Sequence, residues 1–292
     1  MSGPAVAIAT CAEHAALDAE GRLLLAALAE LGIRAEPVVW SDEPDGGWER
    51  YDLVVVRQTW DYTFALPRFL AWTRTVADRL LNPPEVIAWN ADKRYLADLT
   101  AAGITTIATE HLPPGAAFSP PPGRFVIKPA VAAGSRGAQV FDDERHAQAR
   151  AHLARLHAHG DHVLVQPYLD AVDGDEGEIA LIFVEGELTH AMHKGPLLAL
   201  DAPAIEVGFR AEQMRLVAAP PPDIVALGQR TLDAVRERFG GPLLFARVDV
   251  LRDPAGEPAV LELELIEPSL FLDFAPGAAQ ALARAIVARL PC

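Results

Sequence analysis

The chain has 292 residues, and its 25 Lys and Arg against 40 Asp and Glu give a formal net charge of −15 at pH 7. Hydrophobic residues make up 51% and charged residues 22%, which supplies a sizeable core and excludes a disordered or collagen-like chain. The acidic balance, without a run of Lys and Arg, excludes a nucleic-acid scaffold but leaves room for a local basic pocket that binds a small anion.

Cysteine usage and hydropathy indicate the compartment. Cys11 and Cys292 are the two cysteines, too few for a disulfide framework, so a reducing cytoplasm is expected. No apolar stretch approaches the roughly 18 to 20 residues of a membrane span, and the N-terminus lacks a cationic leader region. We therefore expect a cytoplasmic protein with a small-molecule substrate and no nucleic-acid or membrane partner. The oligomeric state stays open, a homodimer included.

Short aliphatic runs alternate with helical patterns in the first third of the chain. The pattern predicts strands at 5–9, 36–40 and 52–57 and helices at 15–31 and 66–81, the second helix ending at Asn82-Pro83-Pro84. Short connections between such elements predict a parallel sheet covered by helices.

The remaining two thirds predict further strands and helices around a linker. The Pro- and Gly-rich passage 113–123 is the best linker candidate. Helices are expected at 91–102, 144–159, 223–239 and 278–290. Strands are expected at 104–109, 124–128, 138–141, 163–166, 244–251 and 259–266, and at 179–184 and 188–193, which Glu185-Gly186 joins as a hairpin.

The last two predicted strands alternate apolar with charged residues. Arg247 and Asp249 share one face of the first strand, and Glu262 and Glu264 share one face of the second. If these faces coincide, three carboxylates and an arginine converge, and Mg²⁺ beside nucleotide phosphates is the usual way to offset their repulsion. The alternative, which the alternation taken alone favours, is an amphipathic sheet with a solvated charged face.

A lysine at a strand end precedes a glycine-containing loop. Lys128 closes the apolar run 125–127, and residues 134–137 read Gly-Ser-Arg-Gly. Such a lysine can hold a phosphate while loop N–H groups cover it, although the spacing is not that of a Walker A loop. The alternative is a solvated strand cap. Lys93, expected in a first helical turn, is equally open to the alternative of facing water.

These features occur in the order in which the ATP-grasp superfamily arranges its nucleotide site, with Val163-Leu-Val-Gln-Pro-Tyr168 and Lys194 between them. The chain resembles the glutathione synthetase and ribosomal-protein glutamate ligase branch along essentially its whole length. The resemblance implies an α/β (α+β grasp) fold of three parts. Residues 1–90 would form an N-terminal parallel α/β domain, 91–168 a central lid subdomain with its entry helix, and 169–292 a C-terminal antiparallel-sheet subdomain with the metal site.

The resemblance also implies the cofactor site, for ATP and two Mg²⁺ ions. Lys93 and Lys128 would contact the phosphates, and Asp249, Glu262 and Glu264 would bind metal. The lid would be Gly134, Ser135, Arg136 and Gly137, and the adenine segment Gln166, Pro167, Tyr168 and Leu169. Glu264 stands where the family commonly has Asn, and the run to the following proline is one residue longer, so Glu267 is a further candidate ligand and the number of ions stays open.

The chemistry that the resemblance implies begins with phosphorylation of a carboxylate by ATP. An amine then attacks the acylphosphate and phosphate leaves, with Lys128, Lys194 and Arg247 as catalytic residues that act by electrostatic stabilisation and positioning. The chain shows no convincing Ser/His/Asp or Cys/His set, and none is needed. Two alternatives are a non-catalytic ATP-binding scaffold, motivated by Glu264, and a kinase that releases the acylphosphate.

The N-terminal third is expected to supply the substrate pocket. Arg57, Thr59, Trp60, Asp61 and Tyr62 follow an apolar strand, where open α/β sheets place ligands. Arg57 could clamp a carboxylate, with Trp60 and Tyr62 as walls; the alternative is that these aromatic residues pack under the next helix. Further candidates are His190, His193 and Arg210, and Arg136 is expected either at the γ-phosphate or in solvent.

Four motifs narrow the resemblance. They are Arg57-x-Thr-Trp-Asp-Tyr62, Asn82-Pro-Pro84, Trp89-Asn-x-Asp-Lys-Arg-Tyr95 and Glu264-Leu-Ile-Glu-Pro-Ser-Leu270. They look like the group that contains the cyclo-ligase closing O-ureido-D-serine to D-cycloserine, which joins a carboxylate to a nitrogen of the same molecule. An intermolecular peptide or glutamate ligase is the alternative.

Overall fold

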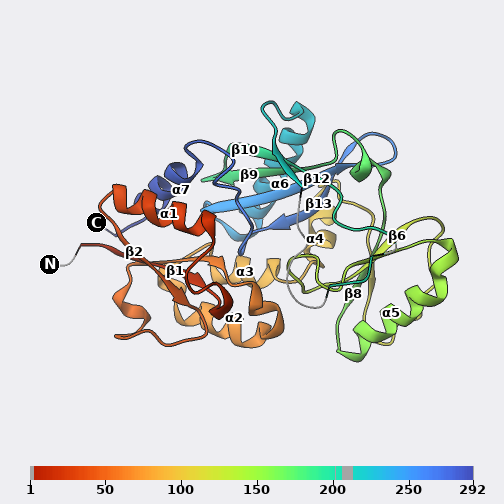
Figure 1. Cartoon of the computed structure of the whole chain (residues 1–292), viewed down its shortest axis with the longest axis horizontal. Helices are drawn as coiled ribbons and strands as arrows, with labels where there is room; N and C mark the ends of the chain where they lie inside the picture. The colour runs from red at the N-terminus through yellow and green to blue at the C-terminus, as the bar shows by residue number, and fades with distance from the viewer. Residues whose placement is uncertain (1–2, 201, 206–212, 292) are drawn as a thin grey trace.

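Three sheets follow one another along the chain (Figure 1). The structure is a computed structural model that describes residues 3–200, 202–205 and 213–291. The first sheet is parallel and the other two are antiparallel, so the expectation of a parallel α/β part followed by antiparallel parts is confirmed. Both ends of the chain lie beside the first sheet (Figure 1). The boundaries 1–90, 91–168 and 169–292 stay a prediction.

The first sheet has the order β2-β1-β3-β4, and β1 and β3 are buried along their whole length. The predicted helix 66–81 is too long, because residues 80 and 81 pair with β3 as an edge strand; their apolar character fits either element, and only the neighbouring strand decides. The elements are β1 (Ala5–Thr10), α1 (Ala19–Glu30), β2 (Arg34–Val39), β3 (Leu53–Gln58), α2 (Leu66–Thr75) and β4 (Leu80–Leu81).

Two short helices connect the first sheet to the second, α3 (Pro84–Asn90) and α4 (Tyr95–Ala101). The sequence pattern predicts one helix over 91–102 and treats Pro83-Pro84 as a breaker. Pro84 instead begins α3, because the first turn of a helix needs no N–H donor there and favours the φ angle of proline. Lys93 consequently lies in the turn between the two helices.

The second sheet has the order β5-β8-β6-β7 and packs against α5 (His146–Ala158) through Phe125, Phe141 and Leu153. The predicted strand 104–109 is wrong. This passage crosses towards the third sheet and forms a single bridge, between Thr106 and Val260. The strands are β5 (Glu110–Leu112), β6 (Phe125–Pro129), β7 (Gln139–Phe141) and β8 (Val163–Pro167).

The third sheet has the order β11-β10-β9-β12-β13, and the predicted hairpin is its β9-β10 pair. Alternate residues of β9 pack on opposite faces: Leu181 and Phe183 against α6 (Pro222–Phe239), and Ile182 against the cluster that contains α7 (Ala278–Val287). The strands are β9 (Glu178–Val184), β10 (Glu187–Lys194), β11 (Met214–Leu216), β12 (Phe245–Arg252) and β13 (Pro258–Glu264).

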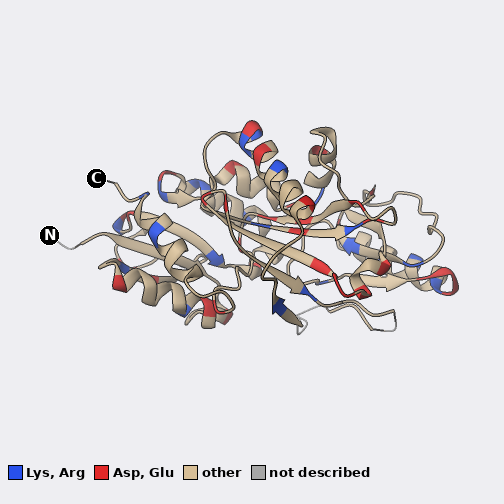
Figure 2. Ribbon diagram, turned by 90° about the horizontal axis from the view of Figure 1, so that it is seen from above, with Lys and Arg blue, Asp and Glu red and all other residues tan. Residues whose placement is uncertain are grey.

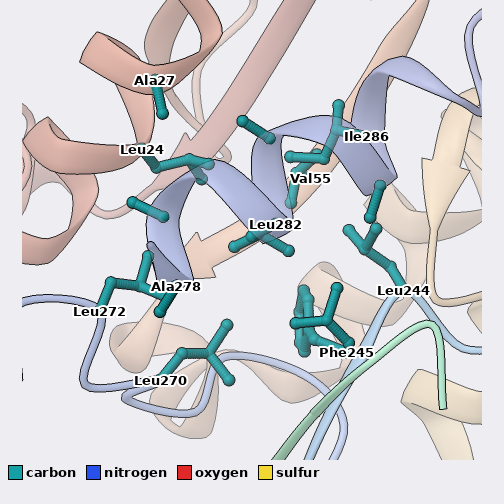
Figure 3. Close-up of a cluster of buried hydrophobic side chains, with 14 of the residues drawn as sticks. Leu24, Ala27, Val55, Leu244, Phe245, Leu270, Leu272, Ala278, Leu282 and Ile286 are labelled. Atoms are coloured by element: carbon teal, nitrogen blue, oxygen red, sulfur yellow. The ribbon is translucent and has the colours of Figure 1, made fainter. Parts of the chain in front are cut away.

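One buried cluster joins the first and third sheets (Figure 3). Leu24 of α1, Val55 of β3 and Phe245 at the start of β12 gather around Leu282 of α7. Because this cluster is fully apolar and buried, it holds the end of β3 in a fixed position relative to β12.

Acidic and basic positions are spread over the helices and loops, with further acidic positions on long strands in the middle of the molecule (Figure 2).

Asn82 and Asn90 link the same two parts by hydrogen bonds. Asn82 Nδ2 donates to the carbonyl oxygens of Phe245 and Leu265, and its Oδ1 accepts from the N–H of Leu244 at 2.8 Å. Asn90 bonds in the same way to the backbone of Leu263 and Leu265. Each amide satisfies buried backbone groups that would otherwise be desolvated without partners.

We expect Asn82→Ala to lower the free energy of unfolding by roughly 3 kcal/mol or more, because it removes three buried hydrogen bonds. Asn82 also has a φ of +63°, a region that alanine tolerates poorly, so Asn82→Gly should recover the backbone part of the loss. Urea unfolding measures both variants. The control is Gln229→Ala, a half-buried position of α6 whose side chain donates to the exposed Asp233. An Asn82→Ala effect no larger than the control's would contradict the prediction.

Candidate active site

A cavity of about 350 Å³ is lined by residues of all three parts of the chain. One portion is apolar, formed by Ile107, Leu169, Leu251 and Leu261, which also belong to one hydrophobic cluster. The other portion is charged and collects side chains from β6, β10, β12 and β13. A cavity with an apolar part and a convergent polar part suits a ligand with the same division.

The register of β12 and β13 brings the predicted charged residues together. Asp249 lies opposite Glu262, and Arg247 lies opposite Glu264. The prediction that the two charged faces coincide is confirmed. The solvated-face alternative is wrong, because Asp249 is 1% exposed and Arg247 is 6% exposed.

Asp249 is the centre of a buried ion-pair network. Its carboxylate accepts hydrogen bonds from Arg247 Nε and Nη2, both at 2.9 Å, and from Lys194 Nζ at 3.0 Å. Burial opposes ionisation of Asp249, but Arg247 and Lys194 outweigh it and lower the pKa to about 2. Arg247 also pairs with Glu264. The network therefore holds an ionised carboxylate with almost no contact with solvent.

Glu178 is a member of this network that the sequence analysis missed. Its Oε1 lies 2.5 Å from Lys194 Nζ, and burial raises its pKa to about 7 although Lys194 opposes the rise. The signal was present in the hairpin, since extending the predicted 179–184 and 188–193 pairing outward by one pair places Glu178 opposite Lys194.

Two further carboxyls carry raised pKa values. Burial raises the pKa of Glu264 to about 7, with Arg247 opposing and Glu262 adding to the rise. Burial, with Glu264 beside it, raises the pKa of Glu267 to about 8. The lysines and the arginine of the site therefore do not fully neutralise its carboxylates, and these two carboxyls favour their protonated form.

The three lysines of the chain, Lys93, Lys128 and Lys194, all line this cavity. Lys93 donates to the carbonyl oxygen of Ala132 at 2.6 Å and lies 3.1 Å from Glu262 Oε1. Lys128 forms no hydrogen bond or ion pair with the part of the chain that the structure describes, and burial lowers its pKa. Because elsewhere the chain uses arginine for positive charge, a count of lysines would have marked the site. A lysine ammonium is a compact point charge suited to phosphate.

The lid and adenine candidates take the following positions. Gly134, Ser135 and Arg136 line the cavity, whereas Gly137 is absent from the lining. Gly137 has a φ of +71°, and a Cβ there would come within 3.0 Å of Pro129, so glycine lets the loop turn back over β6. The adenine candidates Gln166, Pro167, Tyr168 and Leu169 all line the cavity, beside its apolar portion.

The predicted substrate residues divide into two groups. Trp60 and Tyr62 line the cavity, and Trp60 Nε1 donates to the carbonyl oxygen of Glu267 at 3.3 Å. Arg57, Thr59 and Asp61 are absent from the lining. Arg57 is 1% exposed and pairs with Glu20 of α1, which corrects the expectation of a direct carboxylate clamp. Thr59 is fully buried, and Asp61 accepts a hydrogen bond from Trp40.

His190 and His193 do not line the cavity either. His190 Nε2 forms a hydrogen bond of 2.8 Å with the carbonyl oxygen of Leu270, and burial lowers the pKa of His190. His193 is on the opposite face of β10 from Lys194, because neighbouring strand residues alternate, and lies beside Gly177. Arg210 is outside the described residues. Lining residues that the sequence analysis did not select include Asn90, Leu197, Leu198 and Ser269.

The donor chemistry of this site fits Mg²⁺ held together with a nucleotide. Asp249, Glu262 and Glu264 supply the oxygen ligands that this ion prefers. Within residues 3–200, 202–205 and 213–291, no three His, Cys, Asp or Glu side chains come close enough to hold a metal by themselves. Mg²⁺ commonly takes only one or two carboxylates and completes its shell with phosphates and water, which is compatible with this arrangement.

The raised pKa of Glu267 predicts a pH effect on stability. Its pKa is about 8 in the folded chain against an ordinary 4.5, so between these values the unfolded state has released a proton that the folded state keeps. Stability should then fall as pH rises through this window, by up to about 1.4 kcal/mol per pH unit. We expect Glu267→Gln to lose less stability than the wild type between pH 5.5 and 8, in urea unfolding without nucleotide.

The control for this experiment is Glu257→Gln, an exposed carboxyl in the turn between β12 and β13, which should lose as much stability as the wild type. Equal pH dependence in the Glu267 and Glu257 variants would mean that Glu267 is not the group responsible.

Comparison with solved structures identifies the fold. A D-alanine–D-alanine ligase from Bacillus anthracis superposes with a TM-score of 0.68 over 98% of this chain and 97% of that chain, at 13% identity. A RimK domain ATP-grasp protein from Sphaerobacter thermophilus gives a TM-score of 0.64 over 97% and 99%, at 17% identity. The fold is therefore that of the ATP-grasp proteins, which confirms the predicted fold class.

Closer relatives define the family. The crystal structure of D-cycloserine synthetase DcsG superposes with a TM-score of 0.88 at 35% identity, covering 98% of this chain and 100% of that chain. The cycloserine biosynthesis protein DcsG of Streptomyces lavendulae is 36% identical over 98% of both chains. A family model of the N-terminal domain of D-cycloserine synthetase DcsG matches residues 6–82. The chain belongs to the DcsG family, as its motifs indicate.

In the described parts of the chain, no helix is both long and apolar enough to cross a bilayer.

Proposed function

We propose that this protein is a Mg-ATP-dependent ligase that closes O-ureido-D-serine to D-cycloserine and releases ADP and phosphate. The observation that carries the proposal is the full-length similarity to DcsG, with a TM-score of 0.88 and 36% identity to the Streptomyces lavendulae protein. The buried lysine, arginine and carboxylate set in the cavity supports the same chemistry.

In the proposed reaction the substrate carboxylate receives the γ-phosphoryl group of ATP. The ureido nitrogen that is bonded to oxygen then attacks the acyl carbon, the bond from that carbon to the phosphate oxygen breaks, and phosphate leaves. The carbamoyl group on the same nitrogen must also be lost, by hydrolysis to ammonia and carbon dioxide, for the atoms to balance.

The positions of the cationic side chains in the cavity suggest a separate role for each pair of them. Lys93 and Lys128 would bind phosphate oxygens, and Lys194 and Arg247, fixed by Asp249 and Glu178, would stabilise the charge that develops during phosphoryl transfer. Mg²⁺, when bound by the carboxylates of β12 and β13, would neutralise part of the phosphate charge. The number of ions is left open by this proposal.

The two portions of the cavity suggest where each reactant binds. The apolar portion, bordered by Gln166 to Leu169, suits the adenine ring. Trp60, Tyr62 and Ser269 border the charged portion, so the amino-acid substrate would lie between them and Arg247. Water is kept from the acylphosphate by these aromatic side chains and by the loop that carries Arg136.

The test is turnover of O-ureido-D-serine by the purified protein with ATP and Mg²⁺. We expect phosphate release and a product with the mass of D-cycloserine. Phosphate release with pairs of substrates such as two D-alanine molecules, and none with O-ureido-D-serine, would favour the intermolecular ligase instead. The similarity to D-alanine–D-alanine ligase supports this alternative only at the level of the fold.

The other two alternatives give different results in the same assay. A non-catalytic scaffold would bind ATP without forming ADP under any of these conditions. A kinase would leave an acylphosphate that persists until hydroxylamine is added.

The use of ATP and a small amino-acid substrate is compatible with the expected cytoplasmic location, which stays part of this proposal.

A further inference from the structure

The loop from Ala133 to Gly137, called the lid loop below, contacts the N-terminal part of the chain through a stacked pair. The guanidinium carbon of Arg136 lies 4.3 Å from the centroid of the Phe64 ring. Phe64 is the last residue of the short 3-10 helix Trp60–Phe64 and follows directly on the residues that line the cavity. A guanidinium over an aromatic face at this distance is an attractive contact.

Core packing does not account for Phe64. Its side chain is 65% exposed, the highest value among the exposed large hydrophobic residues in the described ranges, where Leu31 reaches 44%. An exposed aromatic ring can offer its face to a cation. Here the atoms on its face are those of Arg136.

Arg136 likewise has little else to hold it. It lies within 4.0 Å of no carboxylate in the part of the chain that is described, its Nη2 has one long hydrogen bond, of 3.5 Å, to the carbonyl oxygen of Val131, and its Nε is buried without a partner. The stacking on the Phe64 ring is therefore the contact that ties the Arg136 side chain to the N-terminal part of the chain.

The contact joins two segments that carry residues lining the cavity. Gly134, Ser135 and Arg136 line the cavity from the second sheet, and Trp60 and Tyr62 line it from the first. The far end of the lid loop is fixed by a hydrogen bond of 2.9 Å from the N–H of Gly137 to the carbonyl oxygen of Ile205. Between Gly137 and the end of β6, the Arg136–Phe64 pair joins the loop to the segment that carries Trp60 and Tyr62.

We propose that Phe64 is a positioning residue that holds the lid loop over bound nucleotide through Arg136. By slowing the opening of the loop, Phe64 retains ATP and shields the reacting phosphoryl group from water. The retention of nucleotide depends only on the geometry of the loop. The effect on product formation rests on the proposed ligase function.

The primary test measures dissociation of a fluorescent ATP analogue with Mg²⁺ by stopped flow. We expect Phe64→Ala to release the analogue about two to five times faster than the wild type, with an unchanged association rate. Phe64→Trp keeps an aromatic face and should release it no faster than the wild type. Because Phe64 is exposed, the melting temperature of each variant should stay unchanged.

A double-mutant cycle tests whether Arg136 is the partner. Phe64→Ala combined with Arg136→Ala should release the analogue no faster than Arg136→Ala alone. The matched control is Leu23→Ala, an exposed apolar residue on α1 away from the cavity, which should change neither release nor turnover. In turnover assays, Phe64→Ala should raise the amount of phosphate released per D-cycloserine formed, because water reaches the acylphosphate.

Two results would overturn the proposal. Release by Phe64→Ala at the wild-type rate excludes a role in holding the lid loop, and additive effects of the two substitutions exclude the pair. If the wild type makes no D-cycloserine but binds the analogue, the ligase proposal fails while the release rates still decide the role of Phe64. If the wild type binds no analogue at all, both proposals fail.

Discussion

Lys128→Met is expected to lower kcat for ATP turnover by about 10²- to 10³-fold while leaving the free energy of unfolding nearly unchanged. The Lys128 ammonium lines the cavity and forms no ion pair with a described residue, so its removal leaves no buried carboxylate without a partner. Burial lowers its pKa, which means that the cation is poorly solvated until an anion arrives. Phosphate is the anion that the proposed reaction delivers.

Phosphate release and urea unfolding of the same preparation measure both halves of this prediction. Methionine has a similar length and no charge, so the substitution removes the electrostatic contribution with little change in packing. Arg230→Met, on an exposed position of α6, is the matched control and should retain full activity. An unchanged kcat in Lys128→Met would remove this lysine from the site, and a large loss of stability would assign it a structural role.

Asp249→Asn is expected to raise the Mg²⁺ concentration for half-maximal turnover at least about tenfold and to lower the free energy of unfolding by roughly 3 kcal/mol. The carboxylate is 1% exposed and ionised, and Arg247 and Lys194 both bond to it. A neutral amide leaves these two buried cations with less compensation and gives Mg²⁺ a weaker ligand.

The two effects of Asp249→Asn can be separated. Turnover is measured over a Mg²⁺ titration at saturating ATP, and stability is measured by urea unfolding without nucleotide. Asp78→Asn, exposed and outside the cavity, should change neither quantity. A loss of stability with an unaltered Mg²⁺ titration would mean that Asp249 holds the cations in place without binding metal.

The alternation of apolar and charged residues along the chain predicted much of the arrangement of strands that carries this site. Alternation along residues 245–250 and 260–265 was sufficient to place Arg247 and Asp249 on one face and Glu262 and Glu264 on one face, because side-chain period in a strand is a property of the backbone. The hairpin and the parallel first sheet followed from the same kind of signal. The strand 104–109 failed because a short apolar run has the same pattern whether or not a neighbouring strand pairs with it.

The sequence by itself indicated the parallel sheet and the shared faces of the charged strand residues, because side-chain periodicity is a local property of the chain. The ATP-grasp class, and the lysines and carboxylates of the proposed chemistry, came from the resemblance of its motifs. Only the tertiary structure decided that Arg57 is buried against Glu20 and that Arg136 lies over Phe64. It also decided which carboxyls are ionised, since the pKa values of Asp249 and Glu267 depend on neighbours from other strands and on burial. Such contacts join residues far apart in sequence, and packing rather than local pattern selects them.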